Sequence, residues 1–263
     1  MPFVYSLCSS SKGNATYIGD QSRGILIDTG LSLRQFTRQL AFHSIDPSAV
    51  QAIFITHEHS DHIRGLTSIA NLLKVPVYGS RETLEWLINR DHITPGTTVM
   101  EINRKAAEVA DLHVSAFTTP HDSAHSLGYR VTFEDGKTAC MCTDLGCVTE
   151  EVYQNLCGSD FVLLESNYDE VMLETGSYPW FLKRRIFSEN GHLSNRDCAR
   201  TLLDLFGNGT TRFLLGHLSE QNNRPELALH ASLAALSKTG AVIGEDYILS
   251  VARRQSIGEI IEV

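Results

Sequence analysis

Long hydrophobic runs are missing from this sequence. No apolar stretch approaches the roughly 20 residues needed to span a bilayer, and the N-terminus lacks the positive start and apolar run of a secretory signal. Basic residues are also in the minority, because 22 Lys and Arg stand against 31 Asp and Glu, a formal net charge of −9. This balance argues against wholesale electrostatic adhesion to nucleic acid or an anionic membrane, so any phosphate binding must be local. We expect a cytoplasmic protein without membrane association.

Cysteine pairs with the C-x-x-C spacing of zinc or redox motifs are absent as well. The cysteines lie mostly within apolar segments, and they are Cys8, Cys140, Cys142, Cys147, Cys157 and Cys198. A free cysteine packs as a small hydrophobic residue, and disulfides are rare in the cytosol. We therefore expect reduced, buried thiols.

Proline and glycine are too scarce for a disordered or repetitive chain, with 7 Pro, 19 Gly and 42% hydrophobic residues. A length of 263 residues fits one large α/β core, and no linker or internal repeat interrupts it. We therefore expect a single domain over residues 1–263.

Short apolar runs alternate with helical patterns from end to end. The runs predict strands over residues 3–8, 15–19, 24–28, 51–56, 75–78, 112–118, 127–133, 137–142, 161–165 and 213–215. A hairpin turn is predicted at 134–136, and helices over 31–42, 62–73, 194–206 and 225–237. Hairpins followed by βα units in each half favour an α/β fold: a four-layered αββα sandwich of two mixed sheets with helices outside.

The most informative segment is H-E-H-S-D-H at residues 57–62, at the end of a predicted strand. Imidazole and carboxylate groups in this mixture are the ligands that first-row metals need. In an extended turn His57 and His59 point the same way and could share one metal. Asp61 and His62 enter a helix and could serve a second.

Two metals need more ligands than one loop supplies. His121, Asp144 and His217 each follow a separate predicted strand directly. Their shared position at strand ends makes these three residues candidate ligands.

With Asp28 after the strand at 24–28, these motifs together resemble the metallo-β-lactamase superfamily. The resemblance implies one divalent ion held by His57, His59 and His121, and a second held by Asp61, His62 and His217, with Asp144 bridging them. Asp28 would orient the ligand loop. Zinc, manganese or iron would suit these ligands.

Two branches of the superfamily are excluded by particular residues. The best-known β-lactamases have Arg after the aspartate and Cys in place of the later aspartate, where this chain has His62 and Asp144. Only 73 positions separate Asp144 from His217, which is too few for the inserted domain of β-CASP nucleases.

The phrases at 6–17, 59–65, 165–169 and 190–195 are similar to those of the YycJ (WalJ) family, with PhnP-like phosphodiesterases next. This resemblance implies a metal-dependent phosphodiesterase or nuclease, a 5′ to 3′ DNA exonuclease acting on DNA ends. The family often has an acidic residue near position 125, where this chain has His125. We expect that His125 is not a metal ligand, and its role stays open.

Hydrolysis by such a site uses a hydroxide shared by two ions, which also neutralise the scissile phosphate. Asp61 and Asp144 are therefore counted among the catalytic residues. The leaving alkoxide needs a proton donor, and His192, just before a predicted helix, is our candidate. A solvent-exposed histidine at a helix start is the alternative.

Four residues are candidates for substrate contact. Lys12 and Asn14 lie in the polar loop 9–14, which could offer N–H groups to a phosphate or be an ordinary hairpin loop. Ser194 and Asn195 lie at a predicted helix start, where Ser194 also fits a helix cap.

Other functions remain open at this point. The same ligands would serve a glyoxalase II or lactonase-like hydrolase of a thioester or ester, although no thiol-cofactor-binding helical domain is evident after His217. A small cyclic-nucleotide phosphodiesterase is a further alternative. A metal-dependent binding protein without turnover is the third.

Overall fold

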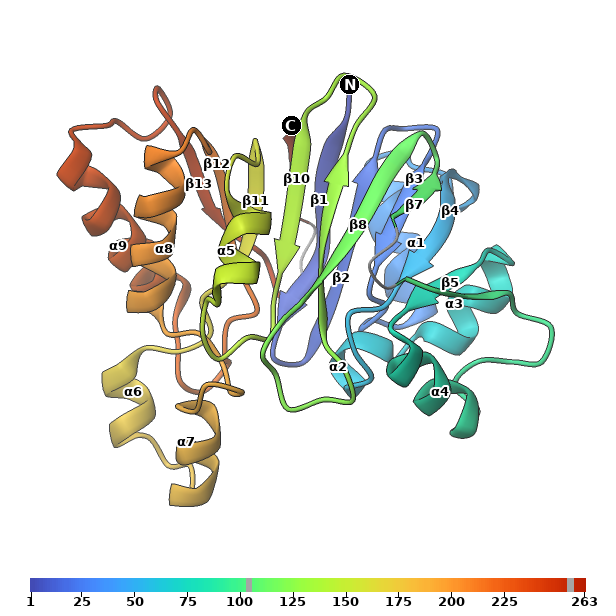
Figure 1. The fold of residues 1–263 in the computed structure, drawn as a ribbon, viewed down its shortest axis with the longest axis horizontal. Coiled ribbons are helices and arrows are strands. Elements are labelled where there is room, and N and C mark those ends of the chain that lie inside the picture. The colour runs from blue at the N-terminus through green and yellow to red at the C-terminus, as the bar shows by residue number, and fades with distance from the viewer. Residues whose placement is uncertain (103–105, 255–257) are drawn as a thin grey trace.

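The computed structural model describes residues 1–102, 106–254 and 258–263, and its strands form two seven-stranded mixed sheets (Figure 1). The first sheet has the order β14 (Ile260–Glu262), β1 (Phe3–Ser10), β2 (Gly13–Gly19), β3 (Gly24–Ile27), β4 (Val50–Phe54), β5 (Val77–Gly79) and β6 (Val99–Glu101). The second has the order β13 (Ile248–Val251), β12 (Arg212–Gly216), β11 (Phe161–Glu165), β10 (Thr138–Cys142), β9 (Leu127–Thr132), β8 (Leu112–Thr118) and β7 (Ala107–Val109).

Each sheet is antiparallel on one side and parallel on the other. The pairs from β14 through β1 and β2 to β3 are antiparallel, and those from β3 to β6 are parallel. In the second sheet the pairs from β7 to β10 are antiparallel, and those from β10 to β13 are parallel. The carboxyl ends of neighbouring parallel strands therefore meet at one edge, where α/β proteins commonly place their sites.

Helices flank both sheets, and most of them cover the outer faces (Figure 1). Those of the N-terminal half are α1 (Leu33–Phe42), the 3₁₀ helix η1 (Pro47–Ala49), α2 (Ser60–Ile63), α3 (Leu66–Leu73) and α4 (Arg81–Asn89). Those of the C-terminal half are α5 (Glu150–Leu156), α6 (Glu170–Thr175), α7 (Trp180–Ile186), α8 (Asn195–Gly207), α9 (Pro225–Leu236) and the 3₁₀ helix η2 (Ser237–Thr239).

Three hydrophobic layers follow from the two-residue period of the strands. Ile25 and Ile27 of β3 pack between the sheets, whereas Leu26 packs against the helices of the first sheet. In β11, Leu163 faces the space between the sheets and Leu164 faces the outer helices. The predicted αββα sandwich is confirmed by this arrangement.

Most predicted elements are present, with one clear correction. The helix expected over 62–73 is broken, because α2 ends at Ile63 and α3 begins at Leu66. The N–H of Gly65 donates to the carbonyl of Thr29 at 2.8 Å, and the loop after β3 thus separates the two helices. Helices α4 to α7 and the strands β6, β7, β13 and β14 were not predicted.

No helix in the described ranges has both the length and the apolar character needed to cross a membrane.

The six cysteines form no disulfides. Four of the thiols are buried, whereas Cys147 and Cys157 are partly exposed, so the expectation of burial is wrong for these two.

Candidate metal centre

Strand β4 leads directly into the histidine-rich segment. His57 and His59 lie in the extended chain after the strand, and Asp61 and His62 lie on the short helix α2. The N–H of His62 donates to the carbonyl of His59 at 2.9 Å, which turns the chain between the two pairs. The side chains of His57 and His62 are fully buried.

Other site residues follow the ends of further strands. Asp28 follows β3, His121 follows β8, Asp144 follows β10 and His217 follows β12. Asp28, Asp144 and His217 have φ angles of 60°, 57° and 53°, respectively. Non-glycine residues adopt this left-handed conformation rarely, and it persists only where the surrounding structure holds it. Three of the eight described non-glycine residues with positive φ are thus site residues at this edge of the sheets.

Ligand atoms converge at this edge. Within each of four overlapping groups, the ligand atoms of the described residues lie within 4.8 Å of one another. The groups are His57, His59 and His121; Asp61, His62 and His217; His57, His62 and Asp144; and Asp144, Glu165, His192 and His217. The first two contain the same residues as the two ligand sets that the resemblance implies.

Several of these atoms are buried polar groups without hydrogen-bonding partners. Within the described part of the chain, Nε2 of His57 has no partner, and Oδ2 of Asp144 and Nδ1 of His217 form no hydrogen bond although they lie within ion-pair distance of each other. An unsatisfied buried polar atom destabilises the folded state by roughly 1–3 kcal/mol unless another partner binds it. Imidazole nitrogen and carboxylate oxygen are ligands of divalent transition metals, so these residues fit such an ion.

Asp144 lies between the two histidine sets. Its Oδ2 atom is 3.0 Å from Nε2 of His62 and 3.2 Å from Nδ1 of His217, while Oδ1 is 3.5 Å from Nε2 of His121. Its two oxygens thus lie near different ligand sets, so Asp144 would be near both ions if each set held one.

Hydrogen bonds outside this cluster orient the histidine rings. Oδ2 of Asp28 lies 2.7 Å from Nδ1 of His62, which leaves Nε2 toward Asp144. Nδ1 of His121 lies 3.0 Å from the carbonyl of Gly191, which leaves Nε2 near His59. Partners of this kind fix the tautomer of a metal-binding histidine.

The electrostatic environment favours the ligand-competent forms of His57 and Asp144. Burial lowers the pKa of His57 well below its usual value, so its imidazole is neutral. Burial tends to raise the pKa of Asp144, but the neighbouring His217 and His62 outweigh it and hold this pKa well below the ordinary range. Asp144 is therefore ionised at neutral pH.

Glu165 is the site residue that the sequence analysis missed. It is the last residue of β11 and is fully buried. Its Oε1 atom lies 2.7 Å from Nδ1 of His192, and its Oε2 atom accepts from the N–H of Leu145 at 2.9 Å. The available signal was a carboxylate at the end of an otherwise apolar run, but its partner lies 27 positions further along the chain.

A cleft adjoins the converging ligands. It is lined by Ser11, Lys12, His59, Ser60, Asp61, Asp144, Asn167, Tyr178, Leu182, Arg185, Ile186, His192, His217, Ser219, Glu220 and Gln221. The predicted substrate contact Lys12 lies at this cleft and pairs with Glu220 at 2.5 Å. Asn14 is buried instead, and its amide nitrogen lies 3.3 Å from Oδ2 of Asp61 and 3.1 Å from Nε2 of His62.

Ser194 and Asn195 are engaged away from the cleft lining. The Ser194 hydroxyl caps α8 by accepting from the N–H of Asp197 at 3.0 Å. Oδ1 of Asn195 accepts from the Ser166 hydroxyl at 2.7 Å and from the Asn223 amide at 2.8 Å. Both residues are buried, so we do not propose them as substrate contacts.

His125 takes no part in the four ligand groups formed by the described residues. Its Nδ1 atom lies 3.1 Å from Oε2 of Glu82, and its Nε2 atom lies 3.3 Å from the Thr118 hydroxyl. The side chain thus pairs with α4 and β8.

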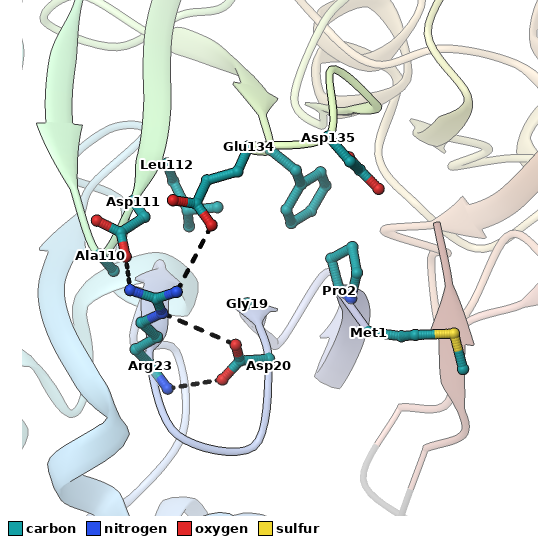
Figure 2. A pocket seen from close by; sticks show the side chains of 11 residues that line it. Met1, Pro2, Gly19, Asp20, Arg23, Ala110, Asp111, Leu112, Glu134 and Asp135 are labelled. Atoms are coloured by element: carbon teal, nitrogen blue, oxygen red, sulfur yellow. Dashed lines mark hydrogen bonds and ion pairs between the residues drawn. The ribbon is translucent and has the colours of Figure 1, made fainter.

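A second pocket lies at the opposite ends of the strands, around the turns at Arg23 and Glu134 (Figure 2). The Arg23 guanidinium is paired there with Asp20, Asp111 and Glu134. None of the residues that line it is a histidine, so this pocket offers no comparable ligand set.

The family is shown by comparison with known proteins. The model of the beta-lactamase superfamily domain matches residues 23–218. Exodeoxyribonuclease WalJ of Streptococcus pneumoniae is 34% identical over 250 residues, covering 93% of this chain and 92% of the relative. Exodeoxyribonuclease YycJ of Bacillus anthracis is 34% identical over 244 residues, covering 92% and 91%. The chain belongs to the metallo-β-lactamase superfamily and, within it, to the family of WalJ and YycJ.

Solved structures agree with this fold. Zinc-bound PqqB from Methylobacterium extorquens superposes with a TM-score of 0.73 at 16% identity, covering 99% of this chain and 100% of PqqB. A diphosphatase of the PhnP family superposes with a TM-score of 0.70 at 17% identity, covering 100% of this chain and 98% of the diphosphatase.

Proposed function

We propose that this protein is a metal-dependent exodeoxyribonuclease that hydrolyses phosphodiester bonds from the 5′ end of a DNA strand. The observation that carries the proposal is the convergence of the four ligand groups beside a cleft, with buried ligand atoms that lack hydrogen-bonding partners. The family relationship supports phosphodiester hydrolysis, because WalJ and YycJ, its relatives at 34% identity, are exodeoxyribonucleases. The six free thiols support a reducing, cytoplasmic location for the activity.

Two divalent ions would be held by the residues of the first two ligand groups. His57, His59 and His121 would hold one ion, and Asp61, His62 and His217 the other, with Asp144 between them. Such ions lower the pKa of bound water and neutralise the charge of a scissile phosphate. Zinc, manganese and iron all suit imidazole and carboxylate ligands, and the zinc of the similarly folded PqqB supports zinc.

His192 would donate the proton that the leaving oxygen needs. It lines the cleft, and its ring stacks on that of His217 at a centroid distance of 5.4 Å. Burial opposes the charged form, but the Glu165 carboxylate outweighs burial and raises the pKa of His192 to about 9. A protonated imidazole held by a carboxylate has the form required of a general acid.

Arg185 of α7 lines the same cleft as His192. Its guanidinium donates to both oxygens of Asp122, the residue after His121. Lys12 provides a second cation at the rim. Both cations are already paired with carboxylates, Arg185 with Asp122 and Lys12 with Glu220, so the metal ions would supply most of the positive charge that an anionic substrate meets.

The test is the hydrolysis of 5′-phosphorylated duplex DNA by the metal-loaded protein with Mn²⁺ or Zn²⁺. We expect progressive release of mononucleotides from the 5′ end. Asp61→Asn should lower the rate at least about 100-fold, because it removes a charged ligand. Asp46→Asn is the matched control with the same chemical change. Asp46 is the N-cap of η1, so this substitution should leave the rate of hydrolysis unchanged.

Each other outcome corrects a different part of the proposal. Release from the 3′ end would reverse the polarity. No release while the ions are shown to be bound would contradict a DNA substrate, and cyclic nucleotides, then thioesters and lactones, would be tested next. Equal activity of Asp61→Asn would contradict the role of its ligand group.

A further inference from the structure

The chain between β11 and α8 forms a projecting arm, which we define as residues 169–187 and which contains α6 and α7. Figure 1 shows both helices beyond the end of the second sheet, at the same end of the molecule as α2. Leu173 and Ile186 of the arm form a small hydrophobic cluster with Tyr168, the residue just before it, and this cluster is separate from the cores of the sheets. It is therefore an appendage beside the metal-binding edge.

The outer face of α7 is aromatic. The exposed fractions of Trp180 and Phe181 are 68% and 75%, the highest of the exposed large hydrophobic side chains other than that of Met1. The other tryptophan, Trp86, is by contrast partly buried, and its ring stacks on His92 at 5.4 Å. Neighbouring exposed aromatic side chains mark an interaction surface, because monomeric proteins seldom expose them together.

Basic charge accompanies these aromatic rings. Arg184 is exposed and lies one helical turn after Trp180, which places it on the same face of α7. Its neighbours are engaged: Lys183 donates to the carbonyl of Glu174 at 2.8 Å, and Arg185 pairs with Asp122. Among the described residues no ion pair is formed by Arg184. A guanidinium beside two aromatic rings suits a phosphate next to stacked bases.

The other face of the same short helix borders the metal cleft. Leu182, Arg185 and Ile186 line the cleft, together with Tyr178 just before α7. A strand whose phosphate lies at the metals would leave the cleft past α7. The exposed aromatic face therefore lies about one helix diameter, on the order of 10 Å, from the wall of the cleft.

We propose that the arm holds single-stranded DNA next to the scissile phosphate, with bases stacked on Trp180 and Phe181 and a backbone phosphate bound by Arg184. This inference rests on the proposed function and names how its substrate is gripped. Base–aromatic stacking tolerates any sequence, as an exonuclease requires. The arm has no net charge, because Asp169, Glu170 and Glu174 balance its three basic residues, and its positive charge is confined to α7.

Binding is measured with the metal-loaded protein and a hydrolysis-resistant phosphorothioate oligonucleotide of about 12 nucleotides, within the length that single-strand sites contact. In a Trp86→Phe background, emission comes from Trp180 alone, and we expect the oligonucleotide to quench it. For the variants, binding is measured with an end-labelled oligonucleotide. Trp180→Ala and Phe181→Ala should each raise its Kd about tenfold. Arg184→Gln should weaken binding. It should also make the dependence of log K on log salt concentration shallower, by about one released counterion.

Phe42→Ala is the matched control, because Phe42 is a 62% exposed aromatic residue at the end of α1. Its Kd should equal that of the wild type. Unchanged Kd in all three arm variants, or no quenching of Trp180, would overturn the proposal. Conversion of a dimer to a monomer by Trp180→Ala, with Kd unchanged, would identify the face as a self-association surface and would also overturn it.

These experiments test the DNA-binding role of the arm separately from the proposed hydrolytic function. Hydrolysis of the small diester bis(p-nitrophenyl) phosphate by the wild type tests the metal chemistry without a long strand. If the diester is hydrolysed but the arm variants bind the oligonucleotide normally, the arm proposal falls and the function stands. If Trp180 is quenched but neither the diester nor DNA is hydrolysed, the function falls and the binding surface stands.

Discussion

Glu165 and His192 form a buried pair in which Oε1 of the carboxylate lies 2.7 Å from Nδ1 of the imidazole. The other oxygen of Glu165 accepts from the N–H groups of Leu145 at 2.9 Å and Leu193 at 3.3 Å. The backbone N–H groups of Leu145 and Leu193 thus hold the Glu165 carboxylate in place. It holds the His192 ring in one orientation beside Asp144 and His217.

Removal of the imidazole should slow the release of a poor leaving group. We expect His192→Ala to lower kcat on DNA by about 100-fold or more, because general acid catalysis commonly contributes roughly 10² to 10⁴-fold. The loss should be much smaller with bis(p-nitrophenyl) phosphate, whose leaving group needs no proton. The measurement is kcat on both substrates, with metal content determined by elemental analysis. Equal losses on the two substrates would contradict the acid role.

Loss of the negative charge of Glu165 should act through His192. We expect Glu165→Gln to lower kcat on DNA about tenfold, because the amide can still occupy the space but stabilises the imidazolium less. The double variant with His192→Ala should then be no slower than His192→Ala alone. Independent, multiplying losses in this double-mutant cycle would show that Glu165 acts elsewhere.

The metal-binding segment was predictable because its information is local. His57, His59, Asp61 and His62 lie within six positions, and the apolar run at 51–56 before them placed them at a strand end. Glu165 was not assigned a role, because its function depends on a contact made only when β11 packs beside the chain before α8. The break at Gly65 was missed for the same reason, since its partner Thr29 belongs to another strand end.

The short helix α7 and the role of Asn195 were not predicted, for two other reasons. Helix α7 has only seven residues, and its Trp180 and Phe181 face solvent, so the usual rule that apolar residues mark the buried face gave no usable pattern. The role of Asn195 could not be deduced either, because its partners Ser166 and Asn223 are 29 and 28 positions away.

The thiols should divide into two classes. Burial raises the pKa of Cys8 and of Cys140 to about 12 each, so at pH 8 both remain protonated and unreactive. Cys147 and Cys157 are the partly exposed thiols and should be the two that react with 5,5′-dithiobis(2-nitrobenzoate) in the folded protein. All six should react in denaturant, where the pKa values return to the usual range. More than two rapidly reacting thiols in the folded protein would contradict this burial.

Asp28 should control metal affinity without touching the metals. Its carboxylate lies 2.7 Å from Nδ1 of His62 and accepts from the N–H of Thr56 at 2.9 Å, which fixes the strand end that carries the histidines. We expect Asp28→Asn to weaken metal binding about 10 to 100-fold, because partners of this kind set the tautomer of the ligand. Competition with a chromophoric chelator measures the affinity. Asp160→Asn is the matched control: Asp160 accepts from the N–H of Thr138 at 2.8 Å at the opposite end of the second sheet. A similar loss of affinity in both variants would mean that general loosening of the fold, rather than orientation of His62, is responsible.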